Sequence, residues 1–353
     1  MTETALRTIT QLTAHGLVEP EDRTGLEQVA DRYTVTVPPA FADLIDRANP
    51  DDPIARQFIP NTRELETASG ENGDPIGDDA HSPVEGVVHR YPDRVLLKIV
   101  NVCAVYCRFC FRREMVGPEQ SKPLSKAALA AALNYIRSHR EIWEVILTGG
   151  DPLVLSPRRL RSVMSALAEI EHVKVVRFHT RVPVADPDRV TAELVRAMKS
   201  KGRATYVAVH VNHARELTPA ARAACARMAD AGIPLLAQTV LLAGVNDNEQ
   251  SLGELMRALV ECRIKPYYLH HADLAPGTSH FRTNIERGQE LMRNLRGRWS
   301  GLCQPEYVLD IPGGHGKSPI GPGYLDPTES DGRYLVEDFN GGRHYYPHYP
   351  PPL

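Results

Sequence analysis

Seven short apolar runs separated by helical segments constrain the fold of this chain more than any other feature. They are VLLKIV (95–100), VILT (145–148), VKVVRF (173–178), TYVAVHV (205–211), PLLAQTV (234–240), PYYLH (266–270) and YVLDI (307–311). Segments with helical periodicity lie between them, at 124–139, 157–170, 187–200, 218–231, 248–262 and 285–297. Apolar strands that alternate with helices are typical of βαβ units and a parallel sheet. The pattern predicts an α/β fold, a TIM-like (βα)6 barrel that is partial (open) or complete, with a doubly wound sheet as the alternative.

The regions outside this alternation set the expected domain limits. Residues 1–90 contain a mostly helical lead and then a polar stretch, ETASGENGDPIGDDAHSP, which we expect to wrap the surface as a loop. Residues 91–325 are predicted to form the barrel core. Residues 326–353 are predicted to be a C-terminal tail, with a small hairpin before a Pro/Tyr-rich end.

The composition argues against several classes of partner. The 353 residues carry 41 Lys and Arg against 44 Asp and Glu, a formal net charge of −3. That balance gives no electrostatic reason to expect nucleic acid or an anionic membrane as a partner. No stretch of the sequence is apolar for long enough to cross a bilayer. We therefore expect a cytoplasmic protein.

Cys103, Cys107 and Cys110 fall close together directly after the first predicted strand. Six cysteines are too few for a disulfide scaffold, and a tight cluster indicates metal or redox chemistry. Thiolates at Cys-x3-Cys-x2-Cys spacing can bind three irons of a cubane and leave the fourth iron open to chelate a small molecule. A zinc site is the alternative, but a closed structural zinc needs four ligands and the sequence has no second paired cluster.

Other candidate residues recur at the ends of predicted strands, where the active sites of such barrels lie. Gly149, Gly150 and Asp151 follow the second strand. Glycines there let the backbone approach a ligand closely, although GGDP read alone is an ordinary turn. Lys317 lies in a glycine-rich segment, where it is either a surface lysine or a residue that forms a Schiff base with pyridoxal phosphate (PLP). Further polar residues at or near strand ends are His210, Gln238, Asp273 and Asp310.

Together these motifs resemble the radical S-adenosylmethionine (SAM) superfamily and, within it, the lysine 2,3-aminomutase family. The segments that carry the resemblance keep the family's order: HRYPDRVLL, NVCAVYCRFCFRR, ILTGGDPL, HVNHARELT, QTVLLAGVNDN, PYYLHHADLAPGTSHFRT and DIPGGHGKSP. The similarity runs from about residue 53 to residue 324. It implies a radical-SAM barrel. His315 departs from the all-glycine run expected before the lysine.

The resemblance implies a role for each matching residue. It places a [4Fe–4S] cluster on the three clustered cysteines, as metal ligands. It places SAM against residues that lie near the ends of three strands: Gly149, Gly150, Asp151, His210 and Gln238.

The resemblance also implies sites for PLP and for the substrate. Lys317 would form the internal aldimine with PLP, and Arg94 would grip the PLP phosphate. Arg112 would bind the substrate carboxylate, and Asp273 and Asp310 would receive a side-chain ammonium. Two carboxylates in one closed pocket repel each other unless a cation lies between them. The pair therefore favours lysine, with ornithine or arginine as further options.

The implied activity is that of an isomerase that moves the α-amino group of L-lysine to the β-carbon. It would proceed through a PLP aldimine and a 5′-deoxyadenosyl radical, with an electron from a donor such as flavodoxin or ferredoxin. The alternatives are an aminomutase that makes (R)-β-lysine for elongation factor P modification, and one that acts on another basic amino acid. A non-catalytic protein that keeps the fold is a rival from another class. The oligomeric state stays open, with a homo-oligomer among the options.

Overall fold

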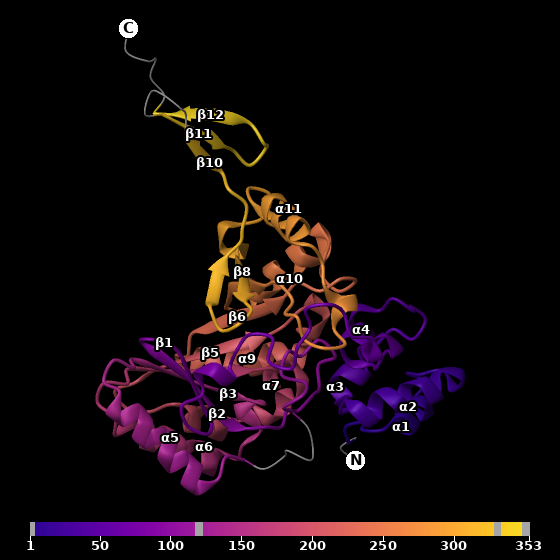
Figure 1. Ribbon diagram of the computed structural model, residues 1–353. Helices are drawn as coiled ribbons and strands as arrows, with labels where there is room; N and C mark the ends of the chain where they lie inside the picture. The colour runs from indigo at the N-terminus through magenta and orange to yellow at the C-terminus, as the bar shows by residue number, and fades with distance from the viewer. Residues whose placement is uncertain (1–3, 117–122, 328–332, 348–353) are drawn as a thin grey trace.

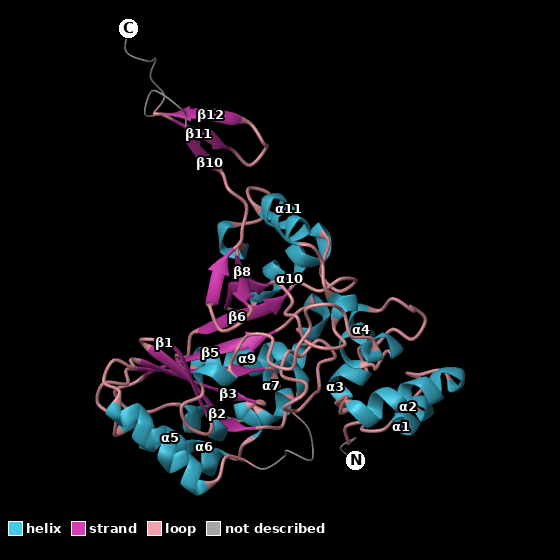
Figure 2. Ribbon diagram, in the orientation of Figure 1, coloured by secondary structure: helices cyan, strands magenta, loops and turns pink. Residues whose placement is uncertain are grey.

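A nine-stranded sheet, curved into an open barrel, forms the centre of the molecule (Figures 1 and 2). The computed structural model describes residues 4–116, 123–327 and 333–347. Strands β2 to β8 pair in parallel, and the edge strands β1 and β9 pair antiparallel with β2 and β8. The nine strands are β1 (Val87–Tyr91), β2 (Arg94–Val100), β3 (Glu144–Gly149), β4 (Val175–Thr180), β5 (Ala204–His210), β6 (Leu235–Val240), β7 (Ile264–His270), β8 (Glu306–Ile311) and β9 (Gly316–Pro319).

The predicted open barrel is confirmed. Each of the seven apolar runs lies on one of the strands β2 to β8, and the strands are neighbours in chain order. A doubly wound sheet would reverse its strand order at a switch point, so the observed order excludes that alternative. In β3, Val145, Ile146 and Leu147 are all buried, which is expected where both faces of a strand are covered.

Six helices connect the consecutive parallel strands and lie around the outside of the sheet (Figure 2): α5 (Lys126–Ser138), α6 (Pro157–Ala168), α8 (Ala192–Met198), α9 (Pro219–Asp230), α10 (Glu249–Glu261) and α11 (Ile285–Leu295). Before each of them stands a Ser, Thr or Asn side chain that accepts a hydrogen bond from the backbone N–H three residues on. The short α7 (Val182–Ala185) adds a turn after β4. In the described residues, no helix is long and apolar enough to cross a membrane.

The N-terminal lead packs on one side of the barrel (Figure 1). It forms α1 (Ile9–Ala14), α2 (Arg23–Arg32), α3 (Pro39–Ala42) and α4 (Pro53–Phe58). The polar stretch that follows is mostly loop, with one 3-10 turn, η3 (Asp79–His81). Gly77 of this loop passes so close to the turn between β8 and β9 that a Cβ there would lie 2.3 Å from the backbone nitrogen of Gly314. The loop therefore covers the hairpin that carries Lys317.

A second, three-stranded antiparallel sheet projects from the barrel near the C-terminus (Figure 1). Its strands are β10 (Leu325–Pro327), β11 (Tyr334–Glu337) and β12 (Arg343–Tyr346). The sequence predicted a hairpin here, and the structure adds β10 as a third strand. Three residues are too few for an alternating pattern to be recognised, which explains why β10 was not predicted.

The contact between Gly150 and the start of the cysteine loop generates a stability prediction. The Gly150 N–H donates to the Val100 carbonyl at 2.5 Å, and a Cβ at residue 150 would lie 2.2 Å from the Val102 carbonyl oxygen. Replacing Gly150 by Ala should lower the free energy of unfolding by about 1–3 kcal/mol, because the cysteine loop must move away. Thermal unfolding of the full chain measures this loss. Gly301→Ala is the control, since no atom lies within 4 Å of its added Cβ. Equal melting temperatures for the two variants would contradict the prediction.

Candidate active site

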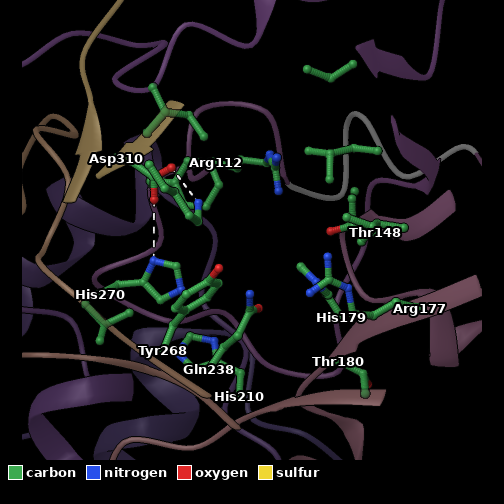
Figure 3. Close-up of a pocket in the computed structure, with 18 of the residues that line it drawn as sticks. Arg112, Thr148, Arg177, His179, Thr180, His210, Gln238, Tyr268, His270 and Asp310 are labelled. Carbon is green, nitrogen blue, oxygen red and sulfur yellow. Dashed lines mark hydrogen bonds and ion pairs between the residues drawn. The ribbon is translucent and has the colours of Figure 1, made fainter. Parts of the chain in front are cut away.

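A cavity of about 800 Å³ occupies the interior of the barrel. Its lining runs from residues at the carboxyl ends of strands, such as Gly149 and His210, to residues at the amino ends, such as Arg94 and Glu144. Figure 3 shows Asp310 and His270 facing Arg177 and His179 across this space. All the site residues predicted from the sequence line it: Arg94, Cys103, Cys107, Cys110, Arg112, Gly149, Gly150, Asp151, His210, Gln238, Asp273, Asp310 and Lys317.

The three cysteines lie in the loop after β2, and each carries a free thiol. Burial raises the pKa of all three thiols, to about 11 for Cys110, and for Cys103 the proximity of Asp151 and the other two sulfurs raises it further. Three partly buried thiolates therefore need a compensating positive charge, which bound iron would supply. No three His, Cys, Asp or Glu side chains in the described ranges converge on a single metal-ion position. A cubane makes a different demand, since each thiolate binds a separate iron.

Gly149 and Gly150 pack against the backbone that leads into the cysteine loop. Gly149 has φ +117, and a Cβ there would lie 2.3 Å from the Val100 carbonyl oxygen. Only glycine combines this φ with so close an approach. Both residues line the cavity, and the Asp151 N–H donates to the Val102 carbonyl at 2.9 Å. The Gly-Gly-Asp segment therefore fixes where the cysteine loop starts.

The Asp151 carboxylate is occupied by protein donors. Its oxygens accept hydrogen bonds from the backbone N–H groups of Leu153, Arg181 and Val182, and from the Thr180 hydroxyl at 2.7 Å. A carboxylate has about four acceptor positions, so these four bonds leave none for a ligand. Asp151 thus fixes the turn between β4 and α7.

His210 and Gln238 occupy directly paired positions on β5 and β6. Figure 3 shows their side chains beside each other in the cavity. The His210 ring packs edge-on against Phe109, with 5.7 Å between the ring centroids. Burial lowers the pKa of His210 well below its usual range, so the ring is neutral. Its Nε2 is buried and has no hydrogen-bond partner within the described part of the chain.

Lys317 and Asp310 face each other across the β8–β9 hairpin. They are directly paired in the antiparallel register, and the Lys317 Nζ lies 2.5 Å from the Asp310 Oδ1. The His270 Nδ1 lies 3.4 Å from the other carboxylate oxygen. Although burial acts to raise it, the pKa of Asp310 is lowered by His270 and Lys317, so the carboxylate is ionised.

Asp273 follows β7 and lines the same cavity. Burial, and then the negative charge of Asp310, raise the pKa of Asp273 to about 7. Its Oδ1 is buried without a hydrogen-bond partner among the described residues. The two carboxyl groups are therefore close enough to oppose each other's ionisation.

Arg94 and Lys317 meet at the Tyr91 side chain. The Arg94 guanidinium lies over the Tyr91 ring, 3.8 Å from its centroid, and the backbone N–H of Lys317 donates to the Tyr91 hydroxyl at 2.7 Å. Tyr91 therefore contacts both the Arg94 guanidinium and the backbone of Lys317.

Arg112 is held at the cavity wall by Asp78 from the N-terminal loop. The Asp78 carboxylate accepts from Arg112 Nη2 at 2.8 Å and from Arg90 Nη2 at 2.9 Å. Burial acts to raise the pKa of Asp78, but Arg112 and Arg90 lower it overall. Asp78 therefore stays charged although it is buried.

Comparison with known proteins identifies the family. A model of the radical SAM superfamily matches residues 97–256. The chain is 40% identical to L-lysine 2,3-aminomutase of Acetoanaerobium sticklandii over 336 residues, which are 95% of this chain and 80% of that protein. The enzyme of the same name from Clostridium subterminale is 40% identical over 337 residues, with the same coverage of 95% and 80%. Glutamate 2,3-aminomutase of Clostridioides difficile is 38% identical over 306 residues, 87% of this chain and 72% of that protein.

The chain belongs to the lysine 2,3-aminomutase family of radical SAM enzymes. Its cavity fits the groups that such an enzyme holds, because two buried polar atoms, His210 Nε2 and Asp273 Oδ1, lack a partner among the described residues. Buried polar atoms of this kind are unfavourable unless a ligand satisfies them.

His315 is the residue that departs from the glycine run expected before Lys317. Its side chain is exposed and its backbone lies outside the left-handed region. The glycines around it, Gly313, Gly314 and Gly316, do lie in that region, with φ of +85, +85 and +87. Glycine is therefore not required at residue 315.

Several residues at this family member's site were not predicted from the sequence. Asp78 lies in a loop for which only a position on the surface was predicted. His179, His270 and Arg181 lie in or next to predicted strands, and no site role was predicted for them. All but Asp78 line the cavity. His179 and His270 could have been predicted from their positions near the carboxyl ends of strands, which is the criterion that identified His210. Asp78 and Arg181 act through contacts with residues distant in sequence, which periodicity does not reveal.

The Arg90–Asp78–Arg112 cluster generates a second prediction. Asp78→Asn leaves two guanidinium groups without a charged partner and should lower the free energy of unfolding by about 3 kcal/mol. Urea unfolding of the full chain measures the change. The neighbouring Asp79 is exposed, so Asp79→Asn should change stability by less than about 0.5 kcal/mol. If Asp78→Asn were as mild as this control, Asp78 would not be what holds Arg112.

Proposed function

We propose that this chain is an isomerase that moves the α-amino group of L-lysine to the β-carbon, forming β-lysine. Two enzymes named for this reaction are about 40% identical to it over 95% of its length. The substrate is a small-molecule amino acid. The choice of lysine rests on one observation: a lysine ammonium, that of Lys317, already lies 2.5 Å from Asp310 in the cavity, which Asp273 also lines.

This observation supports lysine because the pocket carries carboxyl groups where the substrate side chain would end. A substrate ammonium would take the position at Asp310 that Lys317 Nζ occupies, with Asp273 as its second partner. A glutamate side chain would bring a third carboxyl group to the same place, which is unfavourable at close range. The lysine-named relatives agree with this choice and do not favour another basic amino acid or a role in elongation factor P modification.

The proposed cofactors are a [4Fe–4S] cluster, SAM and PLP. When bound, they supply a carbon-centred radical that can remove hydrogen from an unactivated C–H bond, and an aldehyde that carries the migrating nitrogen. Cys103, Cys107 and Cys110 would hold the cluster. Gly149 and Gly150 would present backbone to SAM, with His210 and Gln238 nearby.

The remaining tasks are binding and orientation. Lys317 would provide the amine for PLP, and Arg94, next to Tyr91, would bind its phosphate. Arg112, fixed by Asp78, would bind the substrate carboxylate with its planar guanidinium. We assign Asp151 to fixing the β4–α7 turn, because protein donors already fill its acceptor positions. The barrel wall would keep water from the reacting atoms.

The proposal also includes partners and location. The cluster needs a one-electron donor, such as flavodoxin or ferredoxin. The chain would work in the cytoplasm, and a homo-oligomer is compatible with an exposed apolar surface on the C-terminal sheet, where Leu325, Tyr345 and Tyr346 are exposed.

Turnover under anoxic conditions tests the function. Full-length chain reconstituted with iron, sulfide and PLP is incubated in parallel with lysine, ornithine, arginine and glutamate, plus SAM and dithionite. We expect β-lysine from lysine only when all components are present, and its stereochemistry on a chiral column identifies the hand of the product. Lys317→Ala and Cys107→Ala should each abolish the product. SAM cleavage without any β-lysine would overturn the assignment of lysine as the substrate. It would leave intact the proposal that the chain generates a radical from SAM.

The pKa of Asp273 predicts how lysine binding depends on pH. Asp273 holds its proton below about pH 7 and is ionised above it, so it attracts an ammonium better as the pH rises through 7. The dissociation constant of lysine for the holoenzyme should therefore fall by about tenfold between pH 6 and pH 8. Calorimetric titration measures it.

Two variants separate Asp273 from its neighbour. Asp273→Asn should bind lysine more weakly and lose the pH step. Asp310→Asn should also weaken binding, but a step should remain, moved to lower pH because the negative charge that helps to raise the pKa of Asp273 is lost. A pH step that survives in Asp273→Asn belongs to another group and would contradict the prediction.

A further inference from the structure

A buried guanidinium contacts one of the three clustered sulfurs. Arg181 follows the last residue of β4, and its Nη1 lies 3.0 Å from the Sγ of Cys107, in hydrogen-bonding geometry. Only 5% of the Arg181 surface is exposed. The contact joins residues 74 positions apart in the sequence, so it depends on the tertiary fold.

The other end of the same guanidinium is held by two polar side chains. Arg181 Nη2 donates to Glu216 Oε2 at 2.6 Å and to Gln57 Oε1 at 2.8 Å. Glu216 and Gln57 are both fully buried. Glu216 is itself fixed, because its Oε1 accepts from the backbone N–H groups of Asn212 and His213 at 3.0 and 2.9 Å. These hydrogen bonds hold the Arg181 guanidinium in a single position.

The surroundings of this group strengthen its electrostatic effect. The Arg181 guanidinium lies 4.7 Å from the Phe58 ring centroid and 5.5 Å from that of Phe109. Its backbone N–H donates to the Asp151 Oδ2 at 2.6 Å. Charges act over longer range in such an apolar setting than in water. Neither Arg181 nor Glu216 has a role in the reaction described above.

We propose that Arg181 is a positioning residue that orients Cys107 and raises the reduction potential of the iron–sulfur cluster, and that Glu216 moderates this effect. The inference rests on the proposed function, because it requires the cluster. One-electron reduction adds a negative charge to the cluster, so an adjacent cation stabilises the reduced state and an adjacent anion destabilises it. Hydrogen bonds to the sulfurs and local charge are established determinants of the potentials of such clusters.

The test is the midpoint potential of the cluster in the full chain, reconstituted without oxygen and titrated with dithionite while the spectrum of the reduced cluster is followed. Arg181→Gln should shift the midpoint to a more negative potential. Glu216→Gln should shift it in the opposite direction. Arg181→Lys keeps the charge and should shift it less than Arg181→Gln does. A purely structural role would not produce shifts of opposite sign from two partners of one ion pair.

Arg177→Gln is the matched control. Arg177 lies on the same strand β4 and forms its own buried ion pair, with the Nε 2.9 Å from Glu144 Oε1. It stands four residues from Arg181, a separation of about 13 Å along a strand. Its loss removes a buried charge without removing a contact to sulfur, so the midpoint should change much less than in Arg181→Gln.

Iron and sulfide content is measured for every variant. If Arg181→Gln holds no cluster, Glu216→Gln and Arg181→Lys still decide the matter. Wild-type potentials in both, or shifts of the same sign in Arg181→Gln and Glu216→Gln, would overturn the inference while leaving the proposed function intact. A wild-type chain that assembles no [4Fe–4S] cluster would instead overturn the proposed function, and this inference with it.

Discussion

Buried ion pairs between the N-terminal lead and the barrel determine how the site is assembled. Four carboxylates between residues 52 and 78 have side chains that are almost completely buried, and each binds arginine from the barrel or its loops. Removing one partner of such a pair leaves an uncompensated buried charge, at a cost of about 3–5 kcal/mol. The lead is thus stable in one position against the barrel. The pairs are Asp52 with Arg215, Glu64 with Arg108 and Arg113, Glu71 with Arg282, and Asp78 with Arg90 and Arg112.

The cysteine loop depends on this arrangement because its described residues, 101–116, form no strand or helix. Its backbone bonds partly to the lead: the Tyr106 N–H donates to the Thr36 carbonyl at 3.1 Å, and the Arg108 N–H to the Gln57 carbonyl at 2.9 Å. Buried backbone groups need such partners. Gln57 also binds Arg181 through its side chain, so one residue of α4 contacts both the loop and the guanidinium beside Cys107. The lead is therefore part of the active-site framework.

Features of the fold and the site could be predicted from the sequence where they depend on contacts between residues close together in the chain. The strands and helices of the barrel were predictable because periodicity and capping residues act within a few positions. The cysteines and the strand-end residues were predictable because motif spacing and barrel topology place them at one cavity, whereas only the family resemblance indicated a role for Lys317. Asp78 and Arg181 were not, because their roles come from partners 34 and 74 positions away. The acceptor positions of the Asp151 carboxylate are likewise filled by Thr180 and Arg181, which lie about 30 residues away, and no local sequence pattern reveals these contacts.

The β8–β9 hairpin shows how a short turn determines the chemistry of the pocket. Residues 312–315 form the turn, and the left-handed glycines at 313 and 314 let the chain reverse tightly enough to pair Asp310 with Lys317. Successive strand residues point to opposite faces, so one inserted residue in the turn would direct the Lys317 side chain away from Asp310. In the observed register, the amine and a carboxylate that can bind an ammonium share one face. When a ligand binds the Lys317 amine, Asp310 loses its cation, and in the proposed function a substrate ammonium would restore the charge balance of the pocket.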